Sequence, residues 1–182
     1  MNKVIIMTEQ PKWLVKILNG EKTIEIRKTM SKCELPIDVY LYCTKGTLYF
    51  NAYENEWQTS RVDRKLLNPS LHHRSGKVVA KFTLNNVEDC CDMSRAELEH
   101  KSRLSISEIC LYIKAKEVDP KMVYAWHIDD LVIFNEPMEL REFSTFKRET
   151  IYCGMDCPPY TDWVEYRVRK APQSWQYAYV ED

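Results

Sequence analysis

The sequence predicts a single α+β domain. Two segments, residues 36–43 and 77–85, alternate between apolar and polar side chains, as strands with one buried face do. Short helical segments with their own start and stop signals lie around these strands. At 182 residues the chain has the length of about one domain and can bury a substantial core.

The beginning of the chain predicts a strand followed by a short helix. Residues 1–7 predict the first strand, and Pro11 opens the helix because its fixed φ suits the first turn. Gly20 falls where a helix needs a left-handed terminating residue, so we expect a positive φ there. The apolar side of this helix is expected to be formed by Trp13, Ile17 and Leu18.

A short strand with charges on one face follows Gly20. Ile24 and Ile26 point to one side, Glu25 and Arg27 point to the other, and Lys22 lies at the turn. Three charged groups then meet beside the end of a helix. Two interpretations stay open, a polar pocket or a solvated strand face with an ordinary surface ion pair that contributes little stability.

The second half of the chain predicts two capped helices and then aromatic strands. Residues 93–100 and 105 to about 116 are each preceded by a capping-box pattern, formed by Ser94 with Glu97 and by Ser105 with Glu108. Residues 122–134 predict a strand with a break at Asp129-Asp130, and residues 174–180 predict a closing aromatic strand. Residues 47–75 carry no regular pattern and predict an irregular insertion.

Composition limits the classes of function. The formal net charge is −1, which argues against a protein that coats duplex nucleic acid by bulk electrostatics, so any nucleic-acid site must be a local basic cleft. The seven cysteines and the lack of a leader pattern predict reduced thiols in the cytoplasm. No apolar run is long enough to span a bilayer, so we expect no membrane association.

Motifs for metal, phosphate or hydrolase chemistry are weak or absent in the sequence. Adjacent Cys90-Cys91, His72-His73 and the Cys153/Cys157 pair match no common zinc spacing, so we predict no metal, although a site of His72 or His73 with Cys153 and Cys157 stays open. Four scattered glycines cannot form a Gly-rich phosphate loop, and the G-x-S-x-G and H-E-x-x-H patterns are missing. We therefore expect no cofactor.

Residues 11–28 read P-x-x-x-x-x-I-L-x-G-x-K-x-x-E-x-R-K, which resembles the opening motif of the ASCH domain, a branch of the PUA-like superfamily. Residues 76–82 resemble the central strand of that family. Residues 124–131 and 171–175 are similar to a bacterial and phage subgroup of it. The resemblance implies a small mixed β-barrel flanked by a few helices, one domain over residues 1–182, with the insertion at about 47–75 and a subgroup-specific loop at about 144–170.

The resemblance also implies a nucleic-acid-binding module for RNA, another single strand or a modified nucleotide. Its cleft would lie at the corner between the first helix and the second strand. Lys22 or Lys28 would neutralise phosphate, Arg27 would form a forked contact to phosphate or a base edge, and Glu25 would accept a base amino group or orient Arg27. The remaining candidates for ligand binding are Trp126, His127 and Trp175.

Packing is the alternative role for these last three residues. Trp126 or Trp175 would stack on a base if exposed, but a strand tryptophan is more often part of the core. His127 shares a face with Asp129, which makes either an acid/base pair or a structural histidine oriented by a carboxylate.

An enzyme is the second function that the resemblance leaves open. One branch of the family is similar to an amidohydrolase that removes an acyl group from modified cytidine with a lysine, a threonine and a glutamate. The lysine position is Lys22 here, the threonine position is Glu25, and the glutamate aligns with Ser102, with Glu99 nearby. Ribonuclease activity is a further option. In an enzyme of this kind, Lys22 and Glu25 would be the catalytic candidates; the oligomeric state is not predicted.

Overall fold

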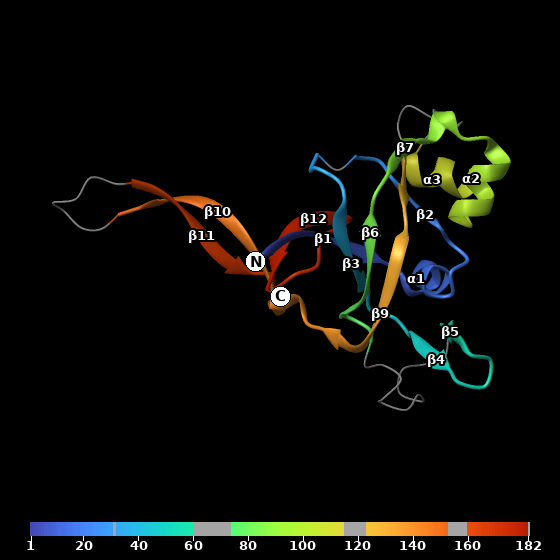
Figure 1. Cartoon of the computed structure of the whole chain (residues 1–182), viewed down its shortest axis with the longest axis horizontal. Coiled ribbons are helices and arrows are strands. Elements are labelled where there is room, and N and C mark those ends of the chain that lie inside the picture. Colours follow the sequence, from blue (N-terminus) through green and yellow to red (C-terminus); the bar gives the residue numbers. More distant parts are fainter. Residues whose placement is uncertain (31, 60–73, 115–122, 153–159, 182) are drawn as a thin grey trace.

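A computed structural model describes residues 1–30, 32–59, 74–114, 123–152 and 160–181, and its main element is a seven-stranded sheet (Figure 1). All neighbouring strands of this sheet run antiparallel, except that β1 and β3 are parallel. In spatial order the strands are β11 (Tyr160–Arg167), β10 (Phe143–Ile151), β12 (Trp175–Val180), β1 (Asn2–Glu9), β3 (Ile37–Cys43), β6 (Val78–Leu84) and β9 (Asp129–Met138).

A second sheet and three helices complete the body of the protein. The second sheet has the order β2 (Ile24–Arg27), β8 (Tyr124–His127) and β7 (Val87–Asp89). Helices α2 (Arg95–Ser102) and α3 (Ile106–Ile113) pack on one face of it, and α1 (Pro11–Leu18) follows β1. A small ribbon, β4 (Tyr49–Asn51) with β5 (Glu56–Gln58), and the 3-10 turns Cys90–Asp92 and Leu140–Glu142 are the remaining elements. The α+β architecture is as predicted, but the described strands form open sheets and not a closed barrel.

The apolar core has three parts, which the two sheets separate. One cluster lies between the sheets and includes Ile5, Val39, Phe82 and Trp126. A second cluster, on the other face of the large sheet, includes Val4, Tyr40 and Phe143. The third lies between the second sheet and helices α2 and α3, and it holds Ile24, Ile26 and Ala125. Apolar clusters therefore lie on both faces of both sheets.

The position of β2 between two clusters decides the environment of its charged face. Ile24 and Ile26 face the α2–α3 side, as the alternation predicts. Glu25 lies opposite Trp126 in the strand register and so faces the interior between the sheets. All four residues of β2 are buried, which makes a solvated strand face impossible for Glu25 and Arg27.

Several local predictions are confirmed. The Ser94 and Ser105 side chains accept hydrogen bonds from the backbone N–H groups of Glu97 and Glu108, and the second capping box is complete. Helix α3 ends at Ile113, a little before the expected end, with Lys114 in the left-handed conformation. The predicted strand over 122–134 does have a break, but it falls at Ile128 and not at Asp129-Asp130, so β8 and β9 belong to different sheets.

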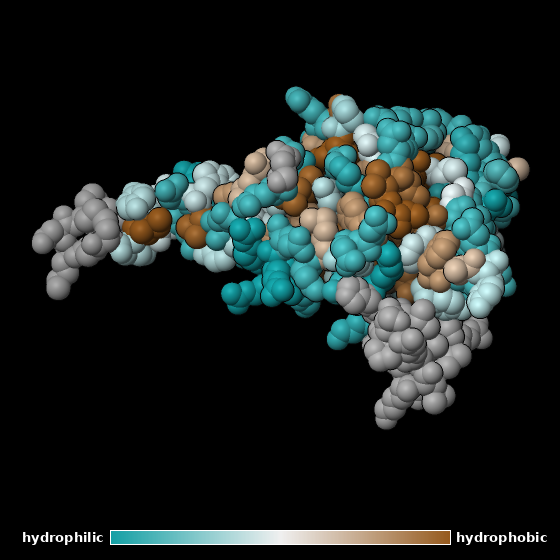
Figure 2. Space-filling view, turned by 60° about the horizontal axis from the view of Figure 1, so that its bottom comes forward, coloured by the Kyte–Doolittle hydropathy of each residue, from teal (hydrophilic) through white to brown (hydrophobic). Residues whose placement is uncertain are grey.

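Two sequence-based predictions need correction. Alternation over residues 77–85 predicts that Val78 shares a face with Ala80, Phe82 and Leu84. The strand register shifts between Val78 and Ala80, so Val78 lies in the second core cluster instead. The segment at about 144–170 is not a loop in its described part. Strands β10 and β11 pair from Ser144 with Arg167 to Ile151 with Tyr160, and they form a hairpin that projects from the body (Figures 1 and 2). We call this hairpin the arm.

Within the described part of the chain, the longest helices span only two turns, and none could cross a lipid bilayer.

Candidate functional site

The candidate site begins at the C-terminus of α1, where the backbone reverses through a compact hydrogen-bonded cap. The N–H of Gly20 donates to Ile17 O, and the N–H of Glu21 donates to Lys16 O, both at 2.9 Å. This pair of bonds is the Schellman arrangement, and it needs the left-handed φ of +72° that Gly20 adopts. The predicted positive φ is confirmed. The cap directs Lys22 back beneath the helix.

Four charged side chains form one buried network at this corner. Lys22 is 2% exposed, Glu25 and Glu9 are each 5% exposed, and Arg27 is 6% exposed. Lys22 Nζ lies 2.7 Å from Glu25 Oε2, close enough for an ion pair although off the line of a hydrogen bond. Arg27 Nη2 donates to Glu9 Oε1 and lies 3.6 Å from Glu25 Oε1. The pocket interpretation of these charges therefore holds, and the surface ion pair does not.

The guanidinium of Arg27 also ties the network to the neighbouring strands. Its Nη1 donates to Ser174 Oγ at 3.2 Å, and its Nη2 lies 3.5 Å from the carbonyl oxygen of Thr8. Its Nε, in contrast, is buried without a hydrogen-bond partner among the described residues. A buried donor of this kind is destabilising unless an acceptor reaches it, so the Nε of Arg27 is left to donate a hydrogen bond to a ligand.

The charges of the network shift the pKa values of its members. Burial and the carboxylate of Glu25 raise the pKa of Glu9 to about 7, against the opposing effects of Arg27 and Lys22. Burial lowers the pKa of Arg27, but the carboxylates of Glu9 and Glu25 together with a hydrogen bond to Tyr112 raise it by more, so the guanidinium stays charged. Near neutral pH, Glu9 is thus divided between its protonated and ionised forms.

A cavity of about 510 Å³ lies against this network. Its walls come from the end of β1, the start of α1, strand β2, helix α3 and the segment before β12. The residues that line it include Glu9, Trp13, Lys22, Glu25, Arg27 and Tyr112.

Aromatic rings and lysines surround the mouth of the cavity. The Trp13 ring has the ammonium groups of Lys12, Lys16 and Lys22 at 4.4, 5.3 and 5.6 Å from its centre. Tyr112 is 38% exposed, and Lys28 Nζ lies 4.7 Å from its ring centre. Lys28 is thus beside the cavity through Tyr112, while Lys22 and Arg27 are inside it. Cationic and aromatic groups therefore lie together beside the cavity.

The structure separates the other predicted binding residues from this cavity. Trp126 is fully buried and packs on Trp175, with ring centres 5.2 Å apart, so it presents no ring face to a base. Trp175 is half-buried, and its Nε1 donates to Thr29 Oγ1. The packing alternative describes Trp126 correctly, because strand β8 lies between two covered faces.

The expected pairing of His127 with Asp129 is wrong. His127 Nε2 lies 3.3 Å from Glu88 Oε2 on the neighbouring strand β7, while Asp129 accepts from Asn85 Nδ2. The turn between β8 and β9 sends Asp129 into the other sheet, which separates the two side chains. His127 is also not among the residues that line the cavity.

Metal binding finds no support in the described residues, where no group of three or more histidine, cysteine or acidic side chains could hold an ion. The pairs Cys153/Cys157 and His72/His73 lie outside the described residues. Cys90 and Cys91 are free thiols, and the pKa of each is raised, by burial at Cys90 and by a hydrogen bond with Asp89 at Cys91.

Sequence reasoning missed three residues of the site. Glu9 ends a buried strand, and only the tertiary fold pairs it with Arg27. Trp13 was assigned to the apolar side of α1, but that side consists of Leu14, Ile17 and Leu18. Two lysines flanking Trp13 at positions 12 and 16 were a usable signal, since they share its side of the helix. Tyr112 had no signal in the sequence.

Comparison with known proteins identifies the fold. A serine-to-alanine mutant of ASCH from Zymomonas mobilis matches with a TM-score of 0.54 and 14% identity, over 95% of this chain and 86% of that one. The unmutated ASCH from the same organism matches with a TM-score of 0.50 and 15% identity, over 75% of this chain and 73% of that one. No family model matches the sequence, and no curated protein matches it either. The chain thus has the fold of an ASCH domain, as its motifs predicted.

Proposed function

We propose that the cavity binds one nucleotide unit of a single-stranded RNA, another single strand or a modified nucleotide. The observation that carries the proposal is the buried polar wall of Glu9, Lys22, Glu25 and Arg27 behind two partly exposed rings. A wall of this kind adds little net stability to a fold, because burying charges costs about as much as their pairing returns. Its directed donors and acceptors instead suit a polar ligand.

The charge balance of the wall favours a base edge over a phosphate at its centre. Lys22 and Arg27 are each paired with a carboxylate, so a phosphate would have to compete with Glu25 and Glu9. A neutral base offers both acceptors and donors, which match Arg27 Nε and the carboxylate oxygens. This assignment replaces the expectation that Lys22 neutralises phosphate.

The mouth of the cavity supplies the other two features of a nucleotide site. Trp13 and Tyr112 offer ring faces for stacking, which is sequence-tolerant because every base has a π-face. Lys12, Lys16 and Lys28 lie beside these rings and pair with no carboxylate among the described residues. They therefore suit the phosphates on either side of a bound base.

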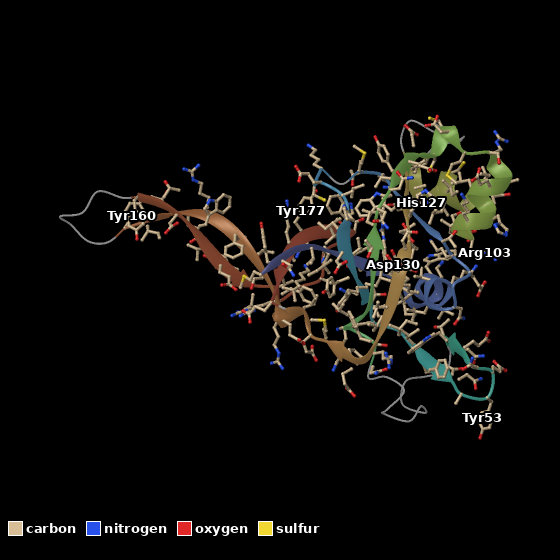
Figure 3. All side chains as sticks on the ribbon, in the orientation of Figure 1. Tyr53, Arg103, His127, Asp130, Tyr160 and Tyr177 are labelled. Atoms are coloured by element: carbon tan, nitrogen blue, oxygen red, sulfur yellow. The ribbon has the colours of Figure 1, made fainter. Side chains whose placement is uncertain are left out.

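Binding of fluorescein-labelled short RNA and DNA, followed by anisotropy at low salt, tests the proposal, with free nucleosides as competitors. Arg27→Lys keeps the charge but loses the planar fork, and we expect affinity to fall roughly tenfold. Tyr112→Ala should weaken binding roughly 5- to 150-fold if a base stacks there. The matched controls are Arg95→Lys on the exposed start of α2 and Tyr53→Ala at the tip of the β4–β5 ribbon (Figure 3). Absence of binding by the wild type, or unchanged binding by both site variants, would overturn the proposal.

A hydrolase is the second candidate, and Glu9 is the observation that favours it. A carboxyl group with a pKa of about 7 in the same cavity as an ammonium group is suited to general acid–base chemistry. In an amide hydrolysis, Glu9 would take a proton from water as the water oxygen bonds to the carbonyl carbon. Lys22 would stabilise the oxyanion, and the proton would pass to the leaving nitrogen as its bond to carbon breaks.

Turnover assays separate the two candidates. Acylated cytidines, simple amides and short RNAs are incubated with the wild type, Lys22→Ala and Glu9→Gln. Catalysis at this site requires that both variants lose turnover while the control Lys81→Ala keeps it. If the wild type binds these ligands but does not turn them over, the protein is a binding module and not a hydrolase.

A further inference from the structure

The arm exposes aromatic side chains well away from the cavity. Only its base is joined to the rest of the sheet, through Phe143 with Val180 and Ser144 with Tyr179. Beyond this point the described residues of β10 and β11 pair only with each other. Trp163 is 65% exposed on the arm, and Tyr160 near its far end is 49% exposed (Figure 3). An isolated ribbon with exposed rings is marginally stable in water, which indicates a surface that contacts a ligand.

One face of the arm forms a groove with the body. The strand register places Phe146, Arg148 and Trp163 on the same face, and Tyr179 of β12 packs edge-on against Phe146 with ring centres 4.9 Å apart. Together with Tyr177 and Lys3, these rings line a hollow of about 510 Å³. Apolar and hydrophilic residues alternate along the arm in Figure 2. We call this hollow the arm groove.

The charges at the arm groove favour an anionic ligand. Glu165, the acidic residue on this face, accepts from Ser144 Oγ and lies 3.9 Å from Arg167 Nε. Lys3 Nζ lies 4.5 Å from the centre of the Tyr177 ring, and Arg148 lies opposite Trp163 in the register. Neither cation forms an ion pair with a described residue. The acid is therefore satisfied, and two cations beside the aromatic rings are available.

Strand β12 runs from the proposed nucleotide site to the arm groove. Ser174, which accepts from Arg27, directly precedes Trp175, and the Trp175 and Tyr177 ring centres are 5.4 Å apart. From Ser174 to Tyr179 the strand advances about 17 Å at roughly 3.4 Å per residue. An oligonucleotide can span this distance, whereas a single nucleotide cannot.

We propose that the arm groove is a second subsite for single-stranded nucleic acid, in which bases stack on Trp163 and Phe146 while Lys3 and Arg148 contact phosphates. This inference rests on the proposed function, since both sites take the same strand. A second copy of the chain is the competing occupant. The β11 edge disfavours it, because Asp162, Glu165 and Arg167 place charges along the strand that would have to pair.

Strand length separates the two subsites experimentally. Affinities of a labelled dinucleotide and of a strand of about 12 nucleotides are measured for the wild type, Trp163→Ala, Arg148→Gln and Arg27→Lys. We expect Trp163→Ala to weaken binding of the longer strand roughly 5- to 150-fold and to leave the dinucleotide unaffected. The logarithm of the binding constant falls linearly with the logarithm of the salt concentration, and we call this gradient the salt slope. Arg148→Gln should also reduce the magnitude of the salt slope for the longer strand by about 0.7. Lys147→Gln is the matched control, since it removes the same charge from the opposite face of the arm.

Each other outcome has a distinct meaning. Loss of longer-strand binding in Arg27→Lys but not in Trp163→Ala or Arg148→Gln overturns the arm groove and leaves the proposed function standing. No binding of either strand by the wild type overturns both. A dimer in analytical ultracentrifugation that Trp163→Ala converts to a monomer, without any effect on strand affinity, would assign the arm to self-association instead.

Discussion

Glu9 at the end of β1 and Arg27 at the end of β2 form an ion pair inside the protein, with more than nine-tenths of each side chain buried. The pair joins the large sheet to the small one at the corner where the cavity lies. Burial and the Glu25 carboxylate raise the pKa of Glu9 to about 7, so the charge of the cavity depends on pH in the physiological range.

Glu9→Gln should remove a pH dependence of stability. The pKa of Glu9 rises from 4.5 to about 7 on folding, so the folded state binds the proton more tightly than the unfolded state does. This contribution to stability is complete below pH 4.5 and is lost as the pH rises to about 7. It amounts to up to about 3 kcal/mol. Urea unfolding from pH 4.5 to 8 should show the wild type losing stability relative to Glu9→Gln over this window; a constant difference would contradict the shifted pKa.

Arg27→Ala should be strongly destabilising. A partly exposed charge would contribute little, but Arg27 is buried, and its removal leaves the Glu9 carboxylate without a paired cation. Breaking a buried pair from one side costs roughly 3–5 kcal/mol. The control is Lys81→Ala, which breaks the half-exposed pair with Asp38 and should cost no more than about 1 kcal/mol. Equal midpoints of denaturation for the two variants would mean that removing Arg27 leaves no uncompensated buried charge.

Gly20→Ala and Gly46→Ala should destabilise the fold for different reasons. At Gly20 a Cβ meets nothing within 4 Å, so the cost comes from the φ of +72° alone and is about 1 kcal/mol. At Gly46 a Cβ would lie 2.5 Å from Cγ of Pro11, whose ring cannot move without shifting the start of α1. We therefore expect Gly46→Ala to lower the melting temperature more and also to weaken ligand binding, because Trp13 lies two residues after Pro11. A larger fall in melting temperature for Gly20→Ala than for Gly46→Ala would contradict this prediction.

The salt dependence of binding should be modest. Lys22 and Arg27 are already neutralised by carboxylates, so the cations that release counterions at the cavity are Lys12, Lys16 and Lys28. Each phosphate contact adds about 0.7 to the magnitude of the slope of log binding constant against log salt concentration. Three contacts predict a slope of about −2 for a short strand, and the further contacts of Lys3 and Arg148 make it about −3.5 for a longer one. Lys28→Gln should lower the magnitude for the short strand by about 0.7. A slope steeper than about −6 would require a basic surface other than these five residues.

The sequence by itself determined the local geometry of the site. A proline at the start of α1, a glycine with positive φ at its end and alternation in β2 are consequences of backbone sterics between near neighbours. They place Lys22, Glu25 and Arg27 together whatever surrounds them. The capping boxes of α2 and α3 were predictable for the same reason, since donor and acceptor are three residues apart.

Only the tertiary structure decided what surrounds those residues. Alternation says that Glu25 and Arg27 share a face, but whether that face is wet or buried depends on the large sheet that covers it. Glu9 becomes their partner because β1 ends there, and Tyr112 reaches the cavity because α3 packs on the second sheet. The burial of Trp126, the separation of His127 from Asp129 and the projection of the arm have the same origin. Each depends on which strands pair across long stretches of chain, and neighbouring residues carry little information about that pairing.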